Sequence, residues 1–228
     1  MLRTFWDRAR RPGMTTLKPF GSARDDAPLR LHLCDANPEV ARSLAEAFRD
    51  VDHAEVLVGD LLRLRCDALV SPANSFGDMG GGLDKRIDDF FRGEAQARAM
   101  GRIAERWHGE LPVGSADVIA MPSRRFPWLV VAPTMRVPGR VAGTLNAYLA
   151  FRAALVVAIG HSDGGTRIAG LACAGLGTGV GAMTGEEAAA QMRAAHDMIV
   201  LQGWQRLLHP MQAPFALGSQ YRPPRGES

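Results

Sequence analysis

Two segments of the chain share one order of features: a short apolar run, a glycine-rich loop and an amphipathic helical pattern. In the first, the run DALV at residues 67–70 is followed by the loop SPANSFGDMGGGLD at residues 71–84. In the second, RIAGLAC at residues 167–173 is followed by AGLGTGVGAMT at residues 174–184. Short apolar runs that alternate with helices are typical of buried strands in a parallel sheet. Both segments therefore predict a strand, a turn and a helix.

The first loop has features that set where its strand ends and its helix begins. Pro72 ends the strand, because proline cannot donate to a sheet ladder. After the glycines, apolar residues recur at three- and four-residue spacing, the period of an amphipathic helix: Leu83, Ile87, Phe90 and Phe91. We therefore expect residues 80–82 to form the turn between strand and helix.

Glycine loops of this kind can hold a phosphate group. Glycine has no Cβ atom, so it can adopt positive φ and let a ligand touch the backbone. The free N–H groups and the positive dipole end of the following helix attract an anion. A flexible turn explains one triple glycine equally well. Two such loops at the carboxyl ends of strands in one sheet, however, suit a ligand with two phosphates.

Two other nucleotide-binding patterns fit the chain poorly. Gly177, Gly179 and Ala182 match a GxGxxA spacing, but that fingerprint belongs to a first βαβ unit with an acidic residue closing the second strand. The acidic candidate here, Asp197, falls inside a helical pattern with little chain after it. No GxxxxGK[ST] run is present, which argues against a P-loop NTPase.

Strand and helix patterns alternate along the rest of the chain. Strands are predicted at residues 29–35, 54–60, 67–71, 116–122, 127–133 and 167–173, and helices at 38–50, 83–91, 94–107, 143–159 and 186–201. This alternation predicts an α/β fold with a mixed, largely parallel sheet and helices on both faces. We expect a single domain over residues 29–208, a poorly ordered basic extension over 1–28 and a Pro- and Gly-rich tail over 209–228.

Composition narrows the classes of function. No apolar run approaches the roughly 18 residues of a membrane span. Three widely spaced cysteines, Cys34, Cys66 and Cys173, favour free thiols in a reducing cytoplasm over a disulfide framework. The histidines and cysteines show no metal-ligand spacing, so we expect no metal and no cofactor. The net charge of +3 permits nucleic-acid binding, but the basic residues are scattered and no recognised motif supports it.

At four places the chain resembles the macrodomain family, whose three-layer α/β/α fold binds ADP-ribose, and the likeness extends over residues 29–208. Gly59-Asp60-Leu61 resembles the family's Gly-Asp-Ile element, which implies that Asp60 accepts a hydrogen bond from the adenine amino group. Residues 67–74 resemble the strand that ends in Ala-Asn, which implies that Asn74 contacts the distal ribose.

The two glycine loops complete the resemblance. Residues 80–84 resemble the family's Gly-Gly-Gly-Val-Asp loop, and residues 177–181 resemble the second loop, which wraps the diphosphate. The ligand-binding residues that the resemblance implies are Asp60, Leu61, Asn74, Gly80, Gly81, Gly82, Leu83, Gly177, Thr178, Gly179, Val180 and Gly181.

The ten-residue step from Asn74 to Asp84 resembles the branch of the family with mono-ADP-ribosyl hydrolase activity, which implies that these two residues are catalytic. Asn74 would orient the ribose hydroxyls. Asp84 falls in the first turn of a helix, where the dipole favours its anion by about 0.3–1 kcal/mol. We therefore expect a low pKa for Asp84 and a role in positioning water or stabilising positive charge at the anomeric carbon.

Departures from the family pattern leave the function open. The chain reads Ser71-Pro72-Ala73-Asn74 where the family usually has Asn-Ala-Ala-Asn, and Gly181 stands where many members place an aromatic residue. In the family this aromatic residue packs on the distal ribose. The residues that could close the distal-ribose pocket in its place are Phe76, Met79, Met135 and Arg136.

Three functions follow from the resemblance. The first is hydrolysis of mono-ADP-ribosylated protein or of O-acyl-ADP-ribose. The second is reading of ADP-ribose without turnover, and the third is removal of phosphate from ADP-ribose 1″-phosphate. Asp84 is the feature that favours an enzyme over a reader. We expect the partner to be ADP-ribose or an ADP-ribosylated protein, and the chain to be a cytoplasmic monomer that does not bind membranes.

Overall fold

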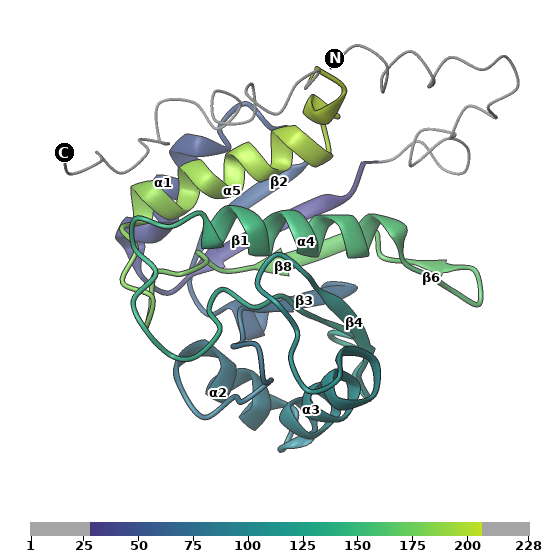
Figure 1. The fold of residues 1–228 in the computed structure, drawn as a ribbon. Coiled ribbons are helices and arrows are strands. Elements are labelled where there is room, and N and C mark those ends of the chain that lie inside the picture. The colour runs from purple at the N-terminus through teal and green to yellow at the C-terminus, as the bar shows by residue number, and fades with distance from the viewer. Residues whose placement is uncertain (1–27, 207–228) are drawn as a thin grey trace, which may run out of the picture.

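The computed structural model describes residues 28–206 (Figure 1). The expected N-terminal extension, apart from its last residue, and the expected C-terminal tail lie outside the described residues. In chain order the elements are β1 (Arg30–Asp35), α1 (Pro38–Ala47), β2 (Ala54–Val58), the 3-10 helix η2 (Leu61–Arg63), β3 (Ala68–Ser71), α2 (Gly82–Phe90), α3 (Glu94–Trp107), β4 (Asp117–Ala120), β5 (Trp128–Val131), α4 (Asn146–Gly160), β6 (Ser162–Asp163), β7 (Thr166–Arg167), β8 (Gly170–Cys173), α5 (Gly185–Ile199) and the 3-10 helix η3 (Gly203–Arg206).

Six strands form one mixed sheet in the order β2-β1-β8-β3-β5-β4. The pairings are parallel, except that β4 runs antiparallel to β5. The strands that precede the two glycine loops, β3 and β8, are neighbours, and Leu69 lies opposite Ala172. Because the two strands run in the same direction, both glycine loops leave the sheet at its carboxyl edge.

Helices cover both faces of the sheet and make the predicted three layers (Figure 1). One hydrophobic cluster lies between the sheet and helices α1, α4 and α5, and another between the sheet and helices α2 and α3. Successive residues of a strand point to opposite faces, so Val70 belongs to the first cluster and Leu69 to the second. Burial on both faces explains why the strands read as continuous apolar runs. The predicted largely parallel α/β fold in a single domain is confirmed.

The strand predicted over residues 167–173 differs from the structure. Its first residue, Arg167, belongs to β7 of the hairpin β6–β7, and only Gly170–Cys173 enters the main sheet. Gly164 and Gly165 both have positive φ, at 53° and 85°, which permits the tight turn of the hairpin. The Asp67 carboxylate accepts hydrogen bonds from the N–H groups of Ala169 and Gly170, each at 2.9 Å, and so holds the chain where it enters β8.

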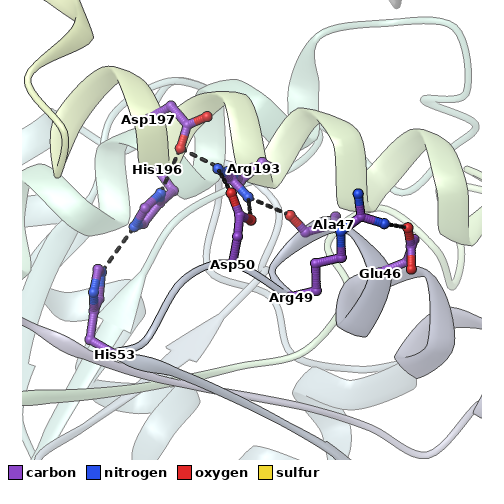
Figure 2. A network of polar contacts seen from close by, with 8 residues as sticks. All are labelled: Glu46, Ala47, Arg49, Asp50, His53, Arg193, His196 and Asp197. Atoms are coloured by element: carbon purple, nitrogen blue, oxygen red, sulfur yellow. Dashed lines mark hydrogen bonds and ion pairs between the residues drawn. The ribbon is translucent and has the colours of Figure 1, made fainter.

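A polar network joins the end of α1 and the connection between α1 and β2 to α5 (Figure 2). The connection enters β2 at its amino end, whereas the glycine loops follow the carboxyl ends of β3 and β8. Arg193 of α5 forms ion pairs with Asp50 and Asp197. The buried ring of His196 lies between Asp197, at 2.8 Å from Nδ1, and His53, at 3.0 Å between the two Nε2 atoms. The network fixes the carboxyl-terminal part of α5 against the connection between α1 and β2.

Three further findings concern the described residues only. None of their helices is long and apolar enough to cross a membrane. The three cysteines are free and buried. Within residues 28–206, no three His, Cys, Asp or Glu side chains are grouped so that they could hold a metal ion.

Candidate functional site

A cavity of about 470 Å³ opens at the carboxyl edge of the sheet. Its wall combines the end of β1 with the loops that follow β2, β3, β5 and β8. The predicted site residues in this wall are Leu61, Asn74, Gly81, Gly82, Leu83, Asp84, Gly177, Thr178, Gly179, Val180 and Gly181. Asp60 and Gly80 are the predicted residues outside it. The volume is within the range typical of small-molecule sites.

The first glycine loop opens towards the cavity where α2 begins. Gly82 starts the helix with a φ of 58°, a conformation that glycine adopts at low cost. A Cβ atom added to Gly81 or Gly82 would meet no atom within 4 Å. Gly80 instead donates its N–H to the Asp78 carboxylate at 3.1 Å. Space for a ligand therefore lies beside Gly81 and Gly82.

The second glycine loop leaves no room for a side chain at Gly181. A Cβ atom there would lie 2.5 Å from both the Gly177 carbonyl oxygen and the Val141 side chain. The Gly181 carbonyl also accepts hydrogen bonds from Val141 and Ala142, at 2.8 and 3.1 Å. No aromatic residue fits at this position unless the loop moves, which gives a packing reason for the departure from the family pattern.

Asn74 lies in the wall with 7% of its surface exposed. Its side-chain oxygen accepts from the N–H groups of Phe76 and Asp78, at 3.0 and 3.3 Å, and its amide nitrogen donates to the Asp78 carbonyl at 2.9 Å. The side chain therefore folds its own loop. An amide nitrogen carries two hydrogens, so one N–H remains for a ligand.

Asp84 lies in the first turn of α2, and its Oδ1 accepts a hydrogen bond from the Ser71 hydroxyl at 2.6 Å. Burial raises the pKa of Asp84 to about 6, although hydrogen bonds from Ser71 and the Ala73 backbone oppose the rise and the nearby Asp78 carboxylate adds to it. The expectation of a low pKa was therefore wrong, because the loss of water around the carboxylate outweighs the helix dipole. Asp84 is still mostly ionised at pH 7, but it is a stronger base than the sequence indicates.

Asp60 does not face the cavity, although Gly59 and Leu61 on either side of it do. Its Oδ1 accepts the N–H of Leu62 at 3.0 Å, which caps η2, and lies 2.8 Å from the Arg86 guanidinium. Arg86 is itself part of the wall. The sequence did not predict Arg86 as a site residue, because it lies among the polar residues between the apolar positions of the helical pattern.

The charge of the cavity is mainly negative. Its acidic side chains are Asp35, Asp78 and Asp84, and within residues 28–206 its one cationic side chain is Arg86. Asp35 ends β1 and was also missed by sequence reasoning. Its Oδ2 accepts the Gly175 N–H at 3.0 Å, which ties β1 to the second glycine loop. Its place at the end of a predicted strand was the available signal.

Of the four residues considered for closing the distal pocket, only Met135 lines the cavity. Met79 is buried in the core. Phe76 and Arg136 are not part of the wall and contact each other, with the guanidinium carbon 5.4 Å from the ring centroid. Glu110 pairs with Arg136 at 2.7 and 2.9 Å, and this pairing raises the pKa of the guanidinium further.

No protein-family model matches the sequence. The chain is 34% identical over 157 residues to an uncharacterized protein of Aeropyrum pernix, an alignment covering 67% of this chain and 75% of the relative. It is 33% identical over 138 residues to an uncharacterized protein of Aquifex aeolicus, which covers 60% and 77%.

Solved structures identify the fold. The macrodomain of Mycobacterium tuberculosis DarG matches with a TM-score of 0.51 at 21% identity, covering 62% of this chain and 88% of that chain. The Oceanobacillus iheyensis macrodomain with ADP matches with a TM-score of 0.54 at 19% identity, covering 64% and 75%. A mutant of the same macrodomain with ADPR gives a TM-score of 0.50 at 20% identity, covering 60% and 73%. This α/β protein therefore has the macrodomain fold. By sequence it belongs to one family with the Aeropyrum and Aquifex proteins.

Proposed function

We propose that the protein binds ADP-ribose in the cavity and hydrolyses ADP-ribosyl conjugates, namely mono-ADP-ribosylated protein or O-acyl-ADP-ribose. The observation that carries the proposal is that one cavity brings both glycine loops together with Asn74 and Asp84. The ligand class is supported by the Oceanobacillus iheyensis macrodomain, which shares the fold and has been solved with ADP and, as a mutant, with ADPR.

The diphosphate of the ligand lies between the two glycine loops in this proposal. The start of α2 presents backbone N–H groups and the positive end of the helix dipole to one side of it. Gly179 leaves open space on the other side, because a Cβ atom there would meet nothing within 4 Å. Arg86 offsets part of the negative charge that the ligand brings to an acidic cavity.

Hydrolysis of an ester at the anomeric carbon of the distal ribose suits the chemistry of Asp84. Its carboxylate takes a proton from a water molecule, and the water oxygen forms a bond to the anomeric carbon. The bond from that carbon to the acceptor oxygen breaks, and the acceptor leaves as a carboxylate that needs no proton. The free N–H of Asn74 holds a ribose hydroxyl. A base with a pKa of about 6 is ionised at pH 7 and close enough to that pH to accept a proton effectively.

The test is release of ADP-ribose from a protein modified on aspartate or glutamate. We expect Asp84→Asn to lower the rate by about 100-fold or more, the contribution typical of a general base, while ADP-ribose affinity stays within about threefold. Asp89→Asn is the matched control, because Asp89 lies on the same helix, is exposed and does not line the cavity.

Other outcomes distinguish the alternatives. Micromolar ADP-ribose binding by the wild-type protein without release from any acceptor would establish a reader. Release of phosphate from ADP-ribose 1″-phosphate would establish a phosphatase. If the protein bound and reduced NAD but did not bind ADP-ribose, it would be a dinucleotide-dependent oxidoreductase.

A further inference from the structure

Ser71 is the last residue of β3, and none of its surface is exposed. Its hydroxyl donates to Oδ1 of Asp84 at 2.6 Å, a short distance typical of a hydrogen bond to a charged oxygen. Ser71 does not line the cavity, whereas Asp84 does. The serine therefore touches the site only through the carboxylate.

The hydroxyl is attached to a well-supported part of the sheet. β3 lies between β8 and β5, and the Ser71 carbonyl accepts a hydrogen bond from the Ala132 N–H at 3.0 Å. The next carbonyl, that of Pro72, accepts from both the N–H and the hydroxyl of Thr134, each at 3.0 Å. Groups supported in this way on a strand hold a contact more accurately than groups on a free loop.

We propose that Ser71 is a positioning residue for Asp84, whose carboxylate it holds in the orientation that meets the attacking water and in the ionised form. The proposal rests on the hydrolase function proposed above. It also predicts a property of the Asp84 carboxyl group that can be measured without turnover.

Several groups act on this carboxylate. The hydroxyl of Ser71 and the N–H of Ala73 favour the anion, while burial and the Asp78 carboxylate disfavour it. Arg86, on the same helix, also lines the cavity. Among these groups, the Ser71 hydroxyl is the one that a single side-chain truncation removes without changing the charge of the cavity. Its loss should raise the pKa of Asp84 above about 6 and leave the carboxylate free to rotate.

The decisive comparison is Ser71→Ala against Ser75→Ala. Ser75 is a second buried serine, four residues along the chain from Ser71, and its hydroxyl has no hydrogen-bond partner among residues 28–206. The two variants thus remove the same atom from buried sites that differ in whether the hydroxyl contacts Asp84. The carbon-13 carboxyl resonance of Asp84, assigned by its absence in Asp84→Asn, is titrated in each protein.

In Ser71→Ala we expect the midpoint of this titration to rise by about one pH unit, the effect of losing a hydrogen bond to a charged group. The acidic limb of the pH–rate profile for ester hydrolysis should move by the same amount. At pH 6.5, kcat should fall about threefold, because a rise of one unit from a pKa of about 6 lowers the ionised fraction of Asp84 by that factor at this pH. KM and ADP-ribose affinity should stay within about twofold. Ser75→Ala should match the wild type in every measurement.

An unchanged Asp84 titration in Ser71→Ala would overturn the inference. A shifted titration in a protein that hydrolyses no ester would overturn the hydrolase function but leave the hold of Ser71 on the carboxylate established. If Ser71→Ala does not fold, Ser71→Cys provides the same test, because a thiol fills the space of the hydroxyl but is only a weak donor. An unshifted titration in that variant would equally refute the proposal.

Discussion

Gly81→Glu is expected to abolish ADP-ribose binding and leave the fold intact. The backbone of Gly81 is extended, with a φ of −150°, so any residue can adopt it. A Cβ atom at this position would meet nothing within 4 Å, and the residue is exposed and lines the cavity. The new side chain therefore extends into the space assigned to the diphosphate, and the melting temperature should stay close to that of the wild type.

The size of the effect follows from charge. Two unit charges about 4 Å apart interact by roughly 4 kcal/mol at an effective dielectric constant of about 20. A diphosphate carries two negative charges, and the cavity wall already has three carboxylates against one guanidinium. The two charges together give roughly 8 kcal/mol of repulsion, and about 4 kcal/mol remains if solvent screening halves it. This raises the Kd by roughly 1,000-fold.

Calorimetric titration with ADP-ribose measures this effect. Gly81→Gln introduces nearly the same bulk without charge and should lose less affinity than Gly81→Glu. Gly101→Glu is the control for added charge, since Gly101 lies on α3, outside the cavity wall, and also has open space around its Cβ position. Wild-type affinity in Gly81→Glu would refute the placement of the diphosphate. Equal losses in the glutamate and glutamine variants would refute the electrostatic part of the reasoning.

Three further predictions concern the cavity and the polar network. Asp84→Asn should stabilise the protein at pH 8 by up to about 3 kcal/mol, because the pKa of Asp84 in the folded state, about 6, exceeds the ordinary value of 3.8, so that the charged carboxylate destabilises the fold. This gain in the free energy of unfolding should largely disappear as the pH falls from 6 to 4, where the carboxyl group becomes neutral. Urea unfolding at pH 8 and pH 4 measures the difference. Arg86→Gln should weaken ADP-ribose binding by about 2- to 5-fold and reduce its salt dependence. Lys85→Gln, on the same helix but outside the wall, should do neither in calorimetry at two salt concentrations. Arg193→Leu removes contacts with Asp50, Asp197 and the Ala47 carbonyl (Figure 2) and should therefore lower the free energy of unfolding by about 1–3 kcal/mol. Ligand affinity should not change, because Arg193 does not line the cavity. Unchanged stability in urea would contradict this reasoning.

Local sequence patterns predicted the elements that carry the site. Pro72 ended β3 as expected. The periodic apolar residues predicted a helix from residue 83, one residue after the observed start of α2 at Gly82. The α3 helix has the predicted bounds. These predictions succeeded because hydrophobic period and proline chemistry act over a few residues.

Side-chain environments were harder to predict. The pKa of Asp84 was expected to be low, because only the helix dipole is visible from sequence. Asp60 was expected to accept a hydrogen bond from adenine, and the sequence did not show that its carboxylate also caps η2 and pairs with Arg86. The direction of a side chain depends on partners that the fold brings together, and Arg86 lies 26 positions from Asp60 in the chain.

The sequence by itself determined that two strand, glycine-loop and helix segments exist and that glycines occur where a phosphate could approach. Only the tertiary structure decided that β3 and β8 are neighbours, which brings both loops to one cavity. It also decided that Ser71 faces Asp84 and that Gly181 admits no side chain. The physical reason is that elements form from interactions along a short stretch of chain, whereas burial, pKa and steric room arise from atoms that folding brings together from distant positions.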